Sequence, residues 1–131
     1  MGFLTGKTAL ITGAGRAVLQ DGSCGSIGYG IATAYAKEGA NLVITGRNVK
    51  KLEEAKQELE SKHGIKVLPV QADVCAGGDN EATVQNVVKQ AVDAFGGIQV
   101  LINNAQASAS GVSLAEHTTE QFDLALYSGL Y

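Results

Sequence analysis

Four short, mostly apolar runs alternate with longer segments in which apolar residues recur at helical spacing. The runs cover residues 7–12, 41–45, 67–70 and 98–102, and they are continuously apolar rather than apolar at every second position. Continuous apolar strands are typical of a parallel sheet that helices cover on both faces. The pattern therefore predicts an α/β protein with a doubly wound parallel sheet, a Rossmann fold that is truncated after the fourth strand and the start of the following helix.

The helical segments carry recognisable start and stop signals. Asn48 is a good N-cap for a helix that Gly64 ends, and Thr118 with Gln121 has the spacing of a capping box. Pro69 cannot donate a backbone hydrogen bond, which indicates an end or edge position for the third strand. A third helix, predicted to be capped by Asp79 or Asn80, carries six apolar residues on one side: Val84, Val87, Val88, Ala91, Val92 and Phe95.

A glycine-rich loop joins the first strand to the first helix. Gly13 ends the strand abruptly, and Ser26 followed by Gly28 opens the helix. This arrangement places free backbone N–H groups and the positive end of a helix around one small volume, which suits a pyrophosphate.

Composition narrows the function further. A net charge of -3 without any basic run argues against a nucleic-acid or membrane-surface role, and no stretch approaches the ~18 apolar residues of a membrane span. No signal peptide is evident, so a cytoplasmic location is expected. Cys24 and Cys75 read as reduced thiols without disulfide or metal spacing, and the isolated His63 and His117 as solvated residues, so no metal site is predicted.

Three segments resemble the short-chain dehydrogenase/reductase family, and the resemblance extends over essentially the whole chain. They are the turn of Thr12, Gly13, Ser26, Ile27, Gly28 and Ala32, the pair Asp73-Val74, and the segment Asn103-Asn104-Ala105. In that family the pair contacts the adenine, and the last segment supports the sheet and lies along the cofactor ribose. The resemblance thus implies a dinucleotide site that includes these residues.

The chain departs from the family pattern at three places. The loop after Gly13 carries nine extra residues, 17–25, whose role the sequence leaves open, and Ser26 stands where the family has its middle glycine. Gln106 replaces a glycine. Gly129 replaces an asparagine, which puts a water-linked proton relay through that position in doubt.

Cofactor choice is predicted from the end of the second strand. NAD-binding versions have a carboxylate there, about 20 residues beyond the glycines, to bind the ribose 2′-hydroxyl. This chain has Gly46 and Arg47 instead, and the guanidinium of Arg47 offers a fork for a 2′-phosphate, with Arg16 able to assist. NADP is therefore the expected cofactor. The alternative is that Arg47 only starts a helix at the surface.

No catalytic residue is predicted within this chain. The resembled family uses a Ser, a Tyr and a Lys on the fifth strand and the next helix, which would lie beyond Tyr131, and no Tyr-x-x-x-Lys occurs here. We therefore expect residues 1–131 to be the N-terminal portion of a longer single-domain enzyme, and this portion alone to be inactive.

A narrower resemblance suggests a substrate. Residues 103–111 and 122–131, with Gln106 and Gly129 among them, resemble bacterial NADP-dependent 12α-hydroxysteroid dehydrogenases that act on bile acids. Ser108 and Ser110 either line the substrate approach or are solvated loop residues. The alternatives are an acyl-carrier-protein ketone or enoyl reductase, and a nucleotide-binding module without catalysis. A small-molecule substrate and a homo-oligomer of the full-length protein are expected.

Overall fold

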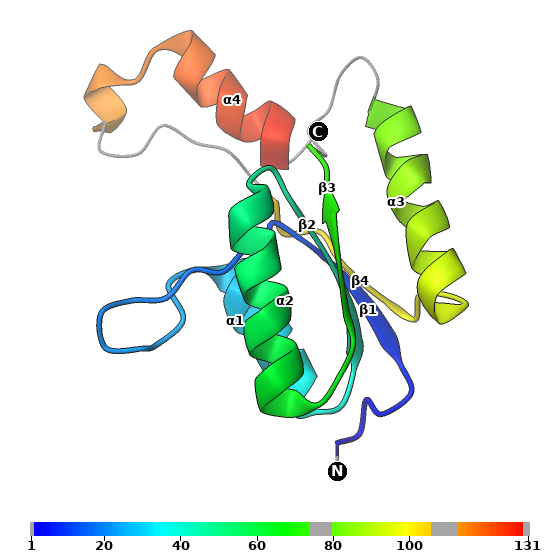
Figure 1. Ribbon diagram of the computed structural model, residues 1–131. Coiled ribbons are helices and arrows are strands. Elements are labelled where there is room, and N and C mark those ends of the chain that lie inside the picture. The colour runs from blue at the N-terminus through cyan, green and yellow to red at the C-terminus, as the bar shows by residue number, and fades with distance from the viewer. Residues whose placement is uncertain (1, 74–79, 106–112, 130–131) are drawn as a thin grey trace.

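The computed structural model describes residues 2–73, 80–105 and 113–129. Strands and helices alternate as predicted (Figure 1). The elements are β1 Thr8–Thr12, α1 Ile27–Lys37, β2 Asn41–Gly46, α2 Val49–His63, β3 Val67–Gln71, α3 Asn80–Phe95, β4 Val100–Ile102, the 3₁₀ helix η1 Leu114–Glu116 and α4 Thr119–Gly129.

The four strands form one parallel sheet in the order β3-β2-β1-β4. β1 pairs with β2 from Thr8 opposite Asn41, and β3 occupies one edge. Pro69 lies opposite Ile44 of β2, so the edge position predicted from this proline is confirmed. All strands run in one direction, and their carboxyl ends therefore meet along one edge of the sheet.

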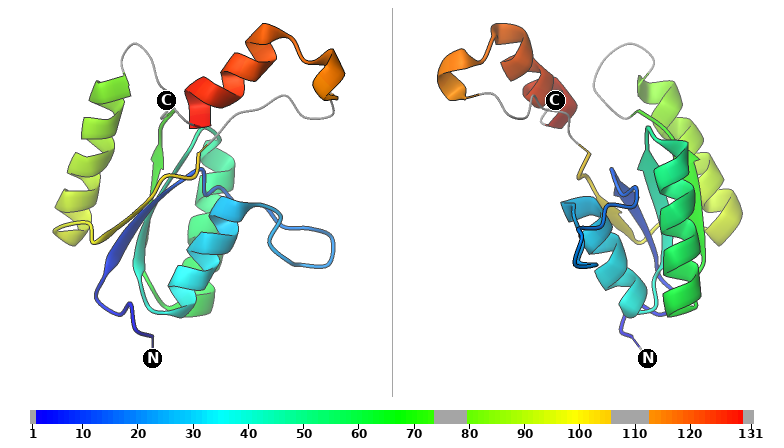
Figure 2. Two further views of the ribbon diagram at one scale, coloured as in Figure 1. Left: turned by 180° about the vertical axis from the view of Figure 1, so that it is seen from behind. Right: turned by 60° about the vertical axis from the view of Figure 1, so that its left-hand side comes forward.

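Helices cover both faces of the sheet, as Figure 2 shows. α1 and α2 lie on one face, where Ile11, Leu42 and Ile44 form a core with residues of both helices. α3 lies on the opposite face and packs Val87 and Ala91 against Leu10 and other strand residues. Alternate residues of the strands thus serve two separate cores, and the predicted doubly wound Rossmann-like fold is confirmed.

The predicted ends of α2 and the predicted start of α4 are also confirmed, and β4 is the strand whose length differs most from the prediction. The Asn48 side chain accepts a hydrogen bond from the backbone N–H of Lys51, and Gly64 caps the other end of α2 at φ +70°. Thr118 and Gln121 exchange the two hydrogen bonds of a capping box. β4 is shorter than predicted: it begins at Val100, and the side-chain oxygen of the preceding Gln99 accepts from the Thr8 N–H.

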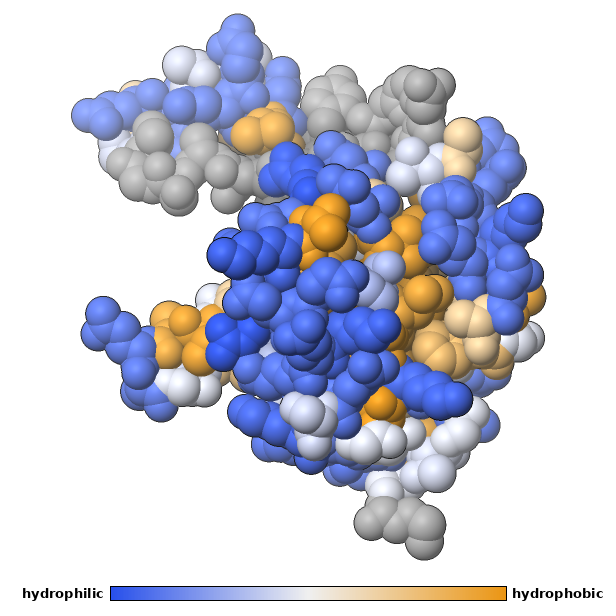
Figure 3. All heavy atoms as spheres, viewed as in Figure 1, coloured by the Kyte–Doolittle hydropathy of each residue, from blue (hydrophilic) through white to orange (hydrophobic). Residues whose placement is uncertain are grey.

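α3 differs from the expectation of one buried apolar side. Val87 and Ala91 are buried, whereas Val84, Val88 and Val92 are 42%, 40% and 45% exposed and recur at every fourth position. Figure 3 shows the contrast between the hydrophilic surface over α2 and the apolar residues that gather between α2 and α3, where the edge strand β3 runs. The predicted helix start at Asp79 falls outside the described residues, and α3 begins at Asn80.

Candidate functional site

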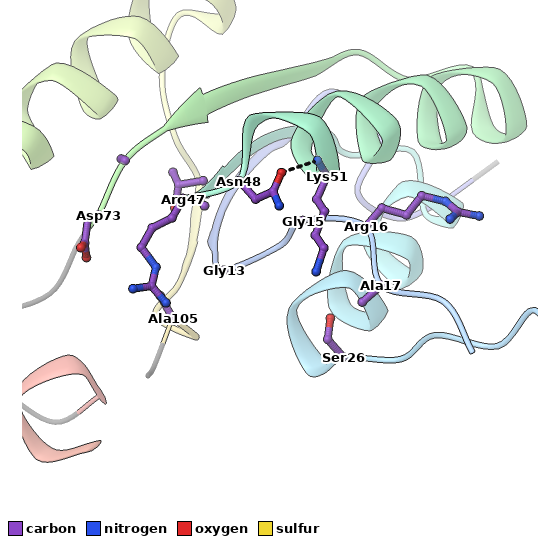
Figure 4. Close-up of a pocket in the computed structure, with 13 residues that line it drawn as sticks. Gly13, Gly15, Arg16, Ala17, Ser26, Arg47, Asn48, Lys51, Asp73 and Ala105 are labelled. Atoms are coloured by element: carbon purple, nitrogen blue, oxygen red, sulfur yellow. Dashed lines mark hydrogen bonds between the residues drawn. The ribbon is translucent and has the colours of Figure 1, made fainter. Parts of the chain in front are cut away.

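A cleft of about 380 Å³ lies at the carboxyl edge of the sheet, where the strand-to-helix loops come together. Figure 4 shows the residues around it. They come from the end of β2, from the loops after the four strands and from the first turn of α2: Gly13, Gly15, Arg16, Ala17, Ser26, Thr45, Gly46, Arg47, Asn48, Lys51, Ala72, Asp73 and Ala105. The sequence predicted this location, since ligands of open α/β sheets bind outside the carboxyl ends of the strands.

Close backbone approach shapes the β1–α1 side of the cleft. Gly13 has φ +68°, and a Cβ there would lie 3.0 Å from Asn104 Nδ2 and 3.1 Å from Ala105 Cα. A Cβ on Gly28 would lie 2.2 Å from the carbonyl oxygen of Gly13 and 2.6 Å from Asn104 Nδ2. Both positions therefore require glycine, because α1 packs directly on the turn that ends β1.

Asn104 fixes this turn from the neighbouring strand. Its Nδ2 donates to the carbonyl oxygens of Thr12 at 3.0 Å and Gly13 at 3.4 Å. The hydroxyl of Thr12 in turn accepts from the backbone N–H groups of Asn104 and Ala105, both at 2.9 Å. The structure thus brings Gly13, Asn104 and Ala105 together, and it gives Thr12 a positioning role that its strand-end location alone did not reveal.

Ser26 begins α1 and lines the cleft. Its side chain accepts from the backbone N–H of Tyr29 at 3.3 Å, which is ordinary N-cap geometry. The serine that replaces the family's middle glycine therefore has a structural use. Ile27, also predicted to contact the cofactor, follows at the first helical position with its side chain 75% exposed, and it is not among the cleft-lining residues.

The inserted residues 17–25 form a small hairpin. Val18 and Cys24 make an antiparallel bridge, and Gly25 N–H donates to the Ala17 carbonyl at 2.7 Å. Asp21 accepts from both the backbone and the hydroxyl of Ser23. The hairpin projects from the body of the protein in Figure 1, and Ala17 at its start lines the cleft.

Arg47 and Asp73 line the β2 and β3 side of the cleft. The Arg47 side chain is exposed and extends into the cleft in Figure 4. Its backbone carbonyl accepts from Gln71 of β3 at 3.2 Å, which ties the two strand ends together. Val74, the partner of Asp73 in the predicted adenine contact, lies outside the described residues.

Lys51 is a cleft residue that the sequence reasoning missed. It occupies the first turn of α2, and its side chain lies between Arg47 and Arg16 in Figure 4. Arg47 precedes the N-cap Asn48 and lies outside the helix, so helical spacing could not relate the two cations. The lining residues thus include three cations and one carboxylate, which favours an anionic ligand.

Arg16 lines the cleft, but its guanidinium is paired with a carboxylate. Its Nε lies 2.6 Å from Glu58 Oε2, and the hydroxyl of the buried Tyr29 donates to Glu58 Oε1 at 2.7 Å. Burial opposes ionisation of Glu58, but the hydrogen bonds from Arg16 and Tyr29 outweigh it, so the pKa of this carboxyl is lowered. Burial, followed by the Glu58 hydrogen bond, raises the pKa of Tyr29, which therefore stays protonated and donates.

Cys24, His63 and His117 are not among the residues that line the cleft. Cys24 is a free, exposed thiol in the hairpin, and Cys75 lies outside the described residues. His63 ends α2, where partial burial and then the nearby lysines lower its pKa, and His117 Nδ1 lies 2.9 Å from the Ser113 carbonyl. Within the described ranges, no cluster of three or more potential metal ligands occurs, and no helix is long and apolar enough to cross a membrane.

A doubly wound parallel sheet with a glycine turn and a helix N-terminus at its carboxyl edge defines a Rossmann-type α/β protein. The family model for the short chain dehydrogenases matches residues 7–126. The chain belongs to this family, whose members are oxidoreductases, and the resemblance seen in the sequence is confirmed.

Individual relatives agree with this assignment. The chain is 56% identical over all its 131 residues to a 12alpha-hydroxysteroid dehydrogenase of a Clostridium species, and it covers 48% of that protein. It is 41% identical over 119 residues to the uncharacterized oxidoreductase YhxC of Bacillus subtilis, of which it covers 37%. The chain thus spans at most about half the length of these two relatives.

Solved structures share the fold. L-sorbose reductase from Gluconobacter frateurii, solved with NADPH and L-sorbose, is 34% identical with a TM-score of 0.71, over 92% of this chain and 41% of that one. A short chain dehydrogenase from Mycobacterium smegmatis is 27% identical with a TM-score of 0.78, over 98% of this chain and 48% of that one.

Proposed function

We propose that this chain is the cofactor-binding part of an NADP(H)-dependent oxidoreductase that interconverts a secondary alcohol and a ketone. The observation that carries the proposal is Arg47, which follows β2 at the position that selects the cofactor and extends into the cleft. A guanidinium there can bind a 2′-phosphate in a bidentate manner, and a family neighbour was solved with NADPH.

The residues present fit such a cofactor. The Gly13 turn has no Cβ, so backbone can approach a diphosphate, and the first N–H groups of α1 have no partners within their own helix. Thr45 lines the cleft with its side chain 1% exposed, and among the described residues its hydroxyl has no hydrogen-bond partner. An orphaned polar group at this place is consistent with a ligand that completes it.

In this proposal the chain's own residues bind and orient. Gly13, Ser26, Ile27 and Gly28 hold the diphosphate, Arg47 selects the phosphorylated ribose, Asp73 and Val74 contact the adenine, and Asn104 with Ala105 keeps the turn in place. The bound cofactor supplies the hydride transfer. The proton-transferring residues of the complete enzyme would lie outside residues 1–131, in the part of the relatives that this chain does not cover.

The substrate we propose is the 12α-hydroxyl of a bile-acid steroid. Identity of 56% over the whole chain to a 12alpha-hydroxysteroid dehydrogenase supports it. Gln106, which carries part of the resemblance, and Ser108 and Ser110, the two candidates for the substrate approach, lie outside the described residues. A cytoplasmic location and a homo-oligomeric complete enzyme are further parts of the proposal, and light scattering of the purified protein tests the second.

The test begins with the intact mass of the purified protein and sequencing across its C-terminal region, which establish whether residues follow Tyr131. NADPH and NADH binding is then measured by nicotinamide fluorescence, and oxidation of a 12α-hydroxy bile acid with NADP⁺ by absorbance. Tighter binding of NADPH with steroid oxidation supports the proposal. Reduction of an acyl thioester ketone or enoyl substrate without steroid oxidation would favour the acyl reductase. Binding without turnover in a protein that ends at Tyr131 would leave a non-catalytic module.

A further inference from the structure

The position of Lys51 in the cleft is set by three contacts of its own backbone and Cβ. Its N–H donates to the N-cap side chain of Asn48 at 3.2 Å, and its carbonyl oxygen accepts from the N–H of Arg16 at 3.0 Å. A Cβ on Gly15 would lie only 3.1 Å from Lys51 Cβ. The glycine at position 15 therefore lets the loop after β1 pack against the first turn of α2, and this packing holds Lys51 beside the loop.

The ammonium group of Lys51 forms no ion pair with a carboxylate among the described residues. The first turn of α2 contains no acidic residue, so the positive end of this helix adds to the charge of Lys51 and Arg47. Thr45, with its buried hydroxyl lacking a partner among the described residues, lines the same cleft. Two independent features of the cleft therefore indicate a ligand: its excess of cations and an unsatisfied buried hydroxyl.

Arg16, the other cation of the cleft, is differently placed. Its guanidinium is held at 2.6 Å by Glu58, and in Figure 4 its side chain points away from Arg47. Glu58 also accepts from Tyr29 and lies 3.5 Å from Lys62 Nζ, so this carboxylate is fixed from several sides. A phosphate beside Arg47 would have to compete with Glu58 for Arg16, whereas Lys51 is not paired with a carboxylate among the described residues.

We propose that Lys51, and not Arg16, is the second cationic ligand of the cofactor 2′-phosphate, and that it acts with Arg47 in selecting NADP(H). The inference rests on the proposed function, since it assigns a further residue to the same site. It revises the role that the sequence suggested for Arg16: that residue positions the loop through its backbone bond to Lys51 and its ion pair with Glu58.

The test compares Lys51→Ala with Lys50→Ala, which removes the same charge one residue earlier on the same helix but outside the cleft lining. Dissociation constants for NADPH and NADH are measured by fluorescence at low ionic strength, where surface charge is least screened. We expect Lys51→Ala to weaken NADPH binding about tenfold, as the loss of one charge-assisted contact implies, and to leave NADH binding unchanged. Lys50→Ala should change neither constant, and Arg16→Ala should weaken both cofactors to a similar extent.

The outcomes separate this inference from the proposed function. If the unmodified protein prefers NADPH and Lys51→Ala keeps the whole preference, Lys51 is not a ligand, although the NADP assignment stands. A selective loss of NADPH binding in Arg16→Ala instead would assign the phosphate to Arg16 and overturn the inference. If the unmodified protein binds NADH as tightly as NADPH, the proposed cofactor itself is wrong.

Discussion

The two sides of the cleft differ in the groups that they present to a ligand. The β1–α1 side is built from backbone: a Cβ on Gly28 would meet the Gly13 carbonyl, and one on Gly13 would meet Asn104 and Ala105. Asn104 holds the turn by hydrogen bonds to main-chain carbonyls. The β2–α2 side is built from exposed side chains, and Arg47 and Lys51 contribute charge without contributing to either core. A ligand in the cleft would thus contact closely packed backbone on one side and positively charged side chains on the other.

This difference indicates which substitutions should affect the fold and which should affect only the ligand preference of the site. A change on the backbone side alters the fold, because the atoms that shape the ligand site are also those through which α1 packs on β1. A change on the charged side alters only which ligand is preferred, since exposed charges contribute little to stability. Variants on the backbone side should therefore lose stability, and variants on the charged side should lose cofactor preference. Five predictions test that division.

The largest effect is expected from Gly28→Ala. Its new methyl group would lie 2.2 Å from the Gly13 carbonyl oxygen, so either α1 or the turn must move. We expect a loss of about 3 kcal/mol or more in the free energy of unfolding, together with loss of cofactor binding. Urea denaturation followed by circular dichroism measures the stability. An unchanged midpoint would contradict the close contact between α1 and the turn.

Asn104→Ala should have the next largest effect. It removes two side-chain hydrogen bonds to Thr12 and Gly13 and leaves their carbonyl groups in a partly buried place. We expect the free energy of unfolding to fall by about 2 kcal/mol and NADPH and NADH binding to weaken together. Asn103→Ala is the control, because Asn103 is the same residue type at the adjacent, exposed position. Equal effects of the two substitutions would remove the positioning role of Asn104.

The backbone side was also the more predictable part of the molecule. Gly13, Gly28 and Asn104 follow strand ends in a sequence whose strands can be recognised from hydrophobicity alone, and the parallel sheet then brings them together. Pro69 and Asn48 were similarly informative, because each restricts the backbone locally.

Features that depend on side-chain reach or on a neighbouring element were not predictable. Arg16 was expected at the phosphate because the sequence shows its proximity to the glycines but not Glu58, which lies 42 residues away and pairs with it. Lys51 was missed because a lysine in a polar helix resembles its neighbours until the loop at Gly15 is seen against it. The valines of α3 likewise share one helical side by spacing, yet the sheet buries only part of that side.

Glu58→Gln tests the charged cluster that Glu58 forms with Arg16 and Tyr29. Because the folded-state pKa of Glu58 is lowered, its contribution to stability is fully present above the ordinary carboxyl pKa and is lost as the pH falls through the lowered value. At neutral pH we expect the substitution to cost about 0.5–1 kcal/mol, because the pair with Arg16 is partly exposed to solvent, and the difference from the unmodified protein should shrink on acidification. Thermal unfolding between neutral pH and about pH 3 measures this, because Glu ionises near pH 4.3 when unperturbed.

Glu54→Gln provides the control for that experiment. Glu54 lies one turn earlier on α2, near the same charges, but the structure gives it no hydrogen bond to Arg16 or Tyr29. Its substitution should leave both the stability and its pH dependence nearly unchanged. Tyr29→Phe should reproduce part of the Glu58→Gln effect at neutral pH. If both glutamate variants behave alike, the Arg16–Glu58–Tyr29 cluster does not hold the loop.

On the charged side, Arg47→Asp should change preference without changing the fold. Losing one charge-assisted bidentate contact costs about 1.5–3 kcal/mol, so the ratio of NADPH to NADH affinity should fall by roughly 10- to 100-fold. The unfolding midpoint should stay within the small range typical of surface substitutions. Lys50→Asp reverses a charge of the same size outside the cleft lining, and it therefore controls for the change in net charge. An affinity ratio that stays constant in Arg47→Asp would exclude Arg47 as the phosphate ligand.

The smallest effect, and the sharpest contrast with Gly28, is expected from Gly30→Ala on the same helix. A Cβ at position 30 would meet only Cys24 Cβ at 3.8 Å, an ordinary contact, so no atom has to move. Alanine also loses less conformational freedom than glycine in a helix interior, and we expect a gain of about 0.5–1 kcal/mol with unchanged cofactor binding. Denaturation of Gly30→Ala and Gly28→Ala is measured side by side. The two substitutions lie two residues apart in one helix and should change the free energy of unfolding in opposite directions. A loss of stability at both positions would mean that α1 itself requires glycine, and that the packing of α1 on the cleft turn is not what selects Gly28.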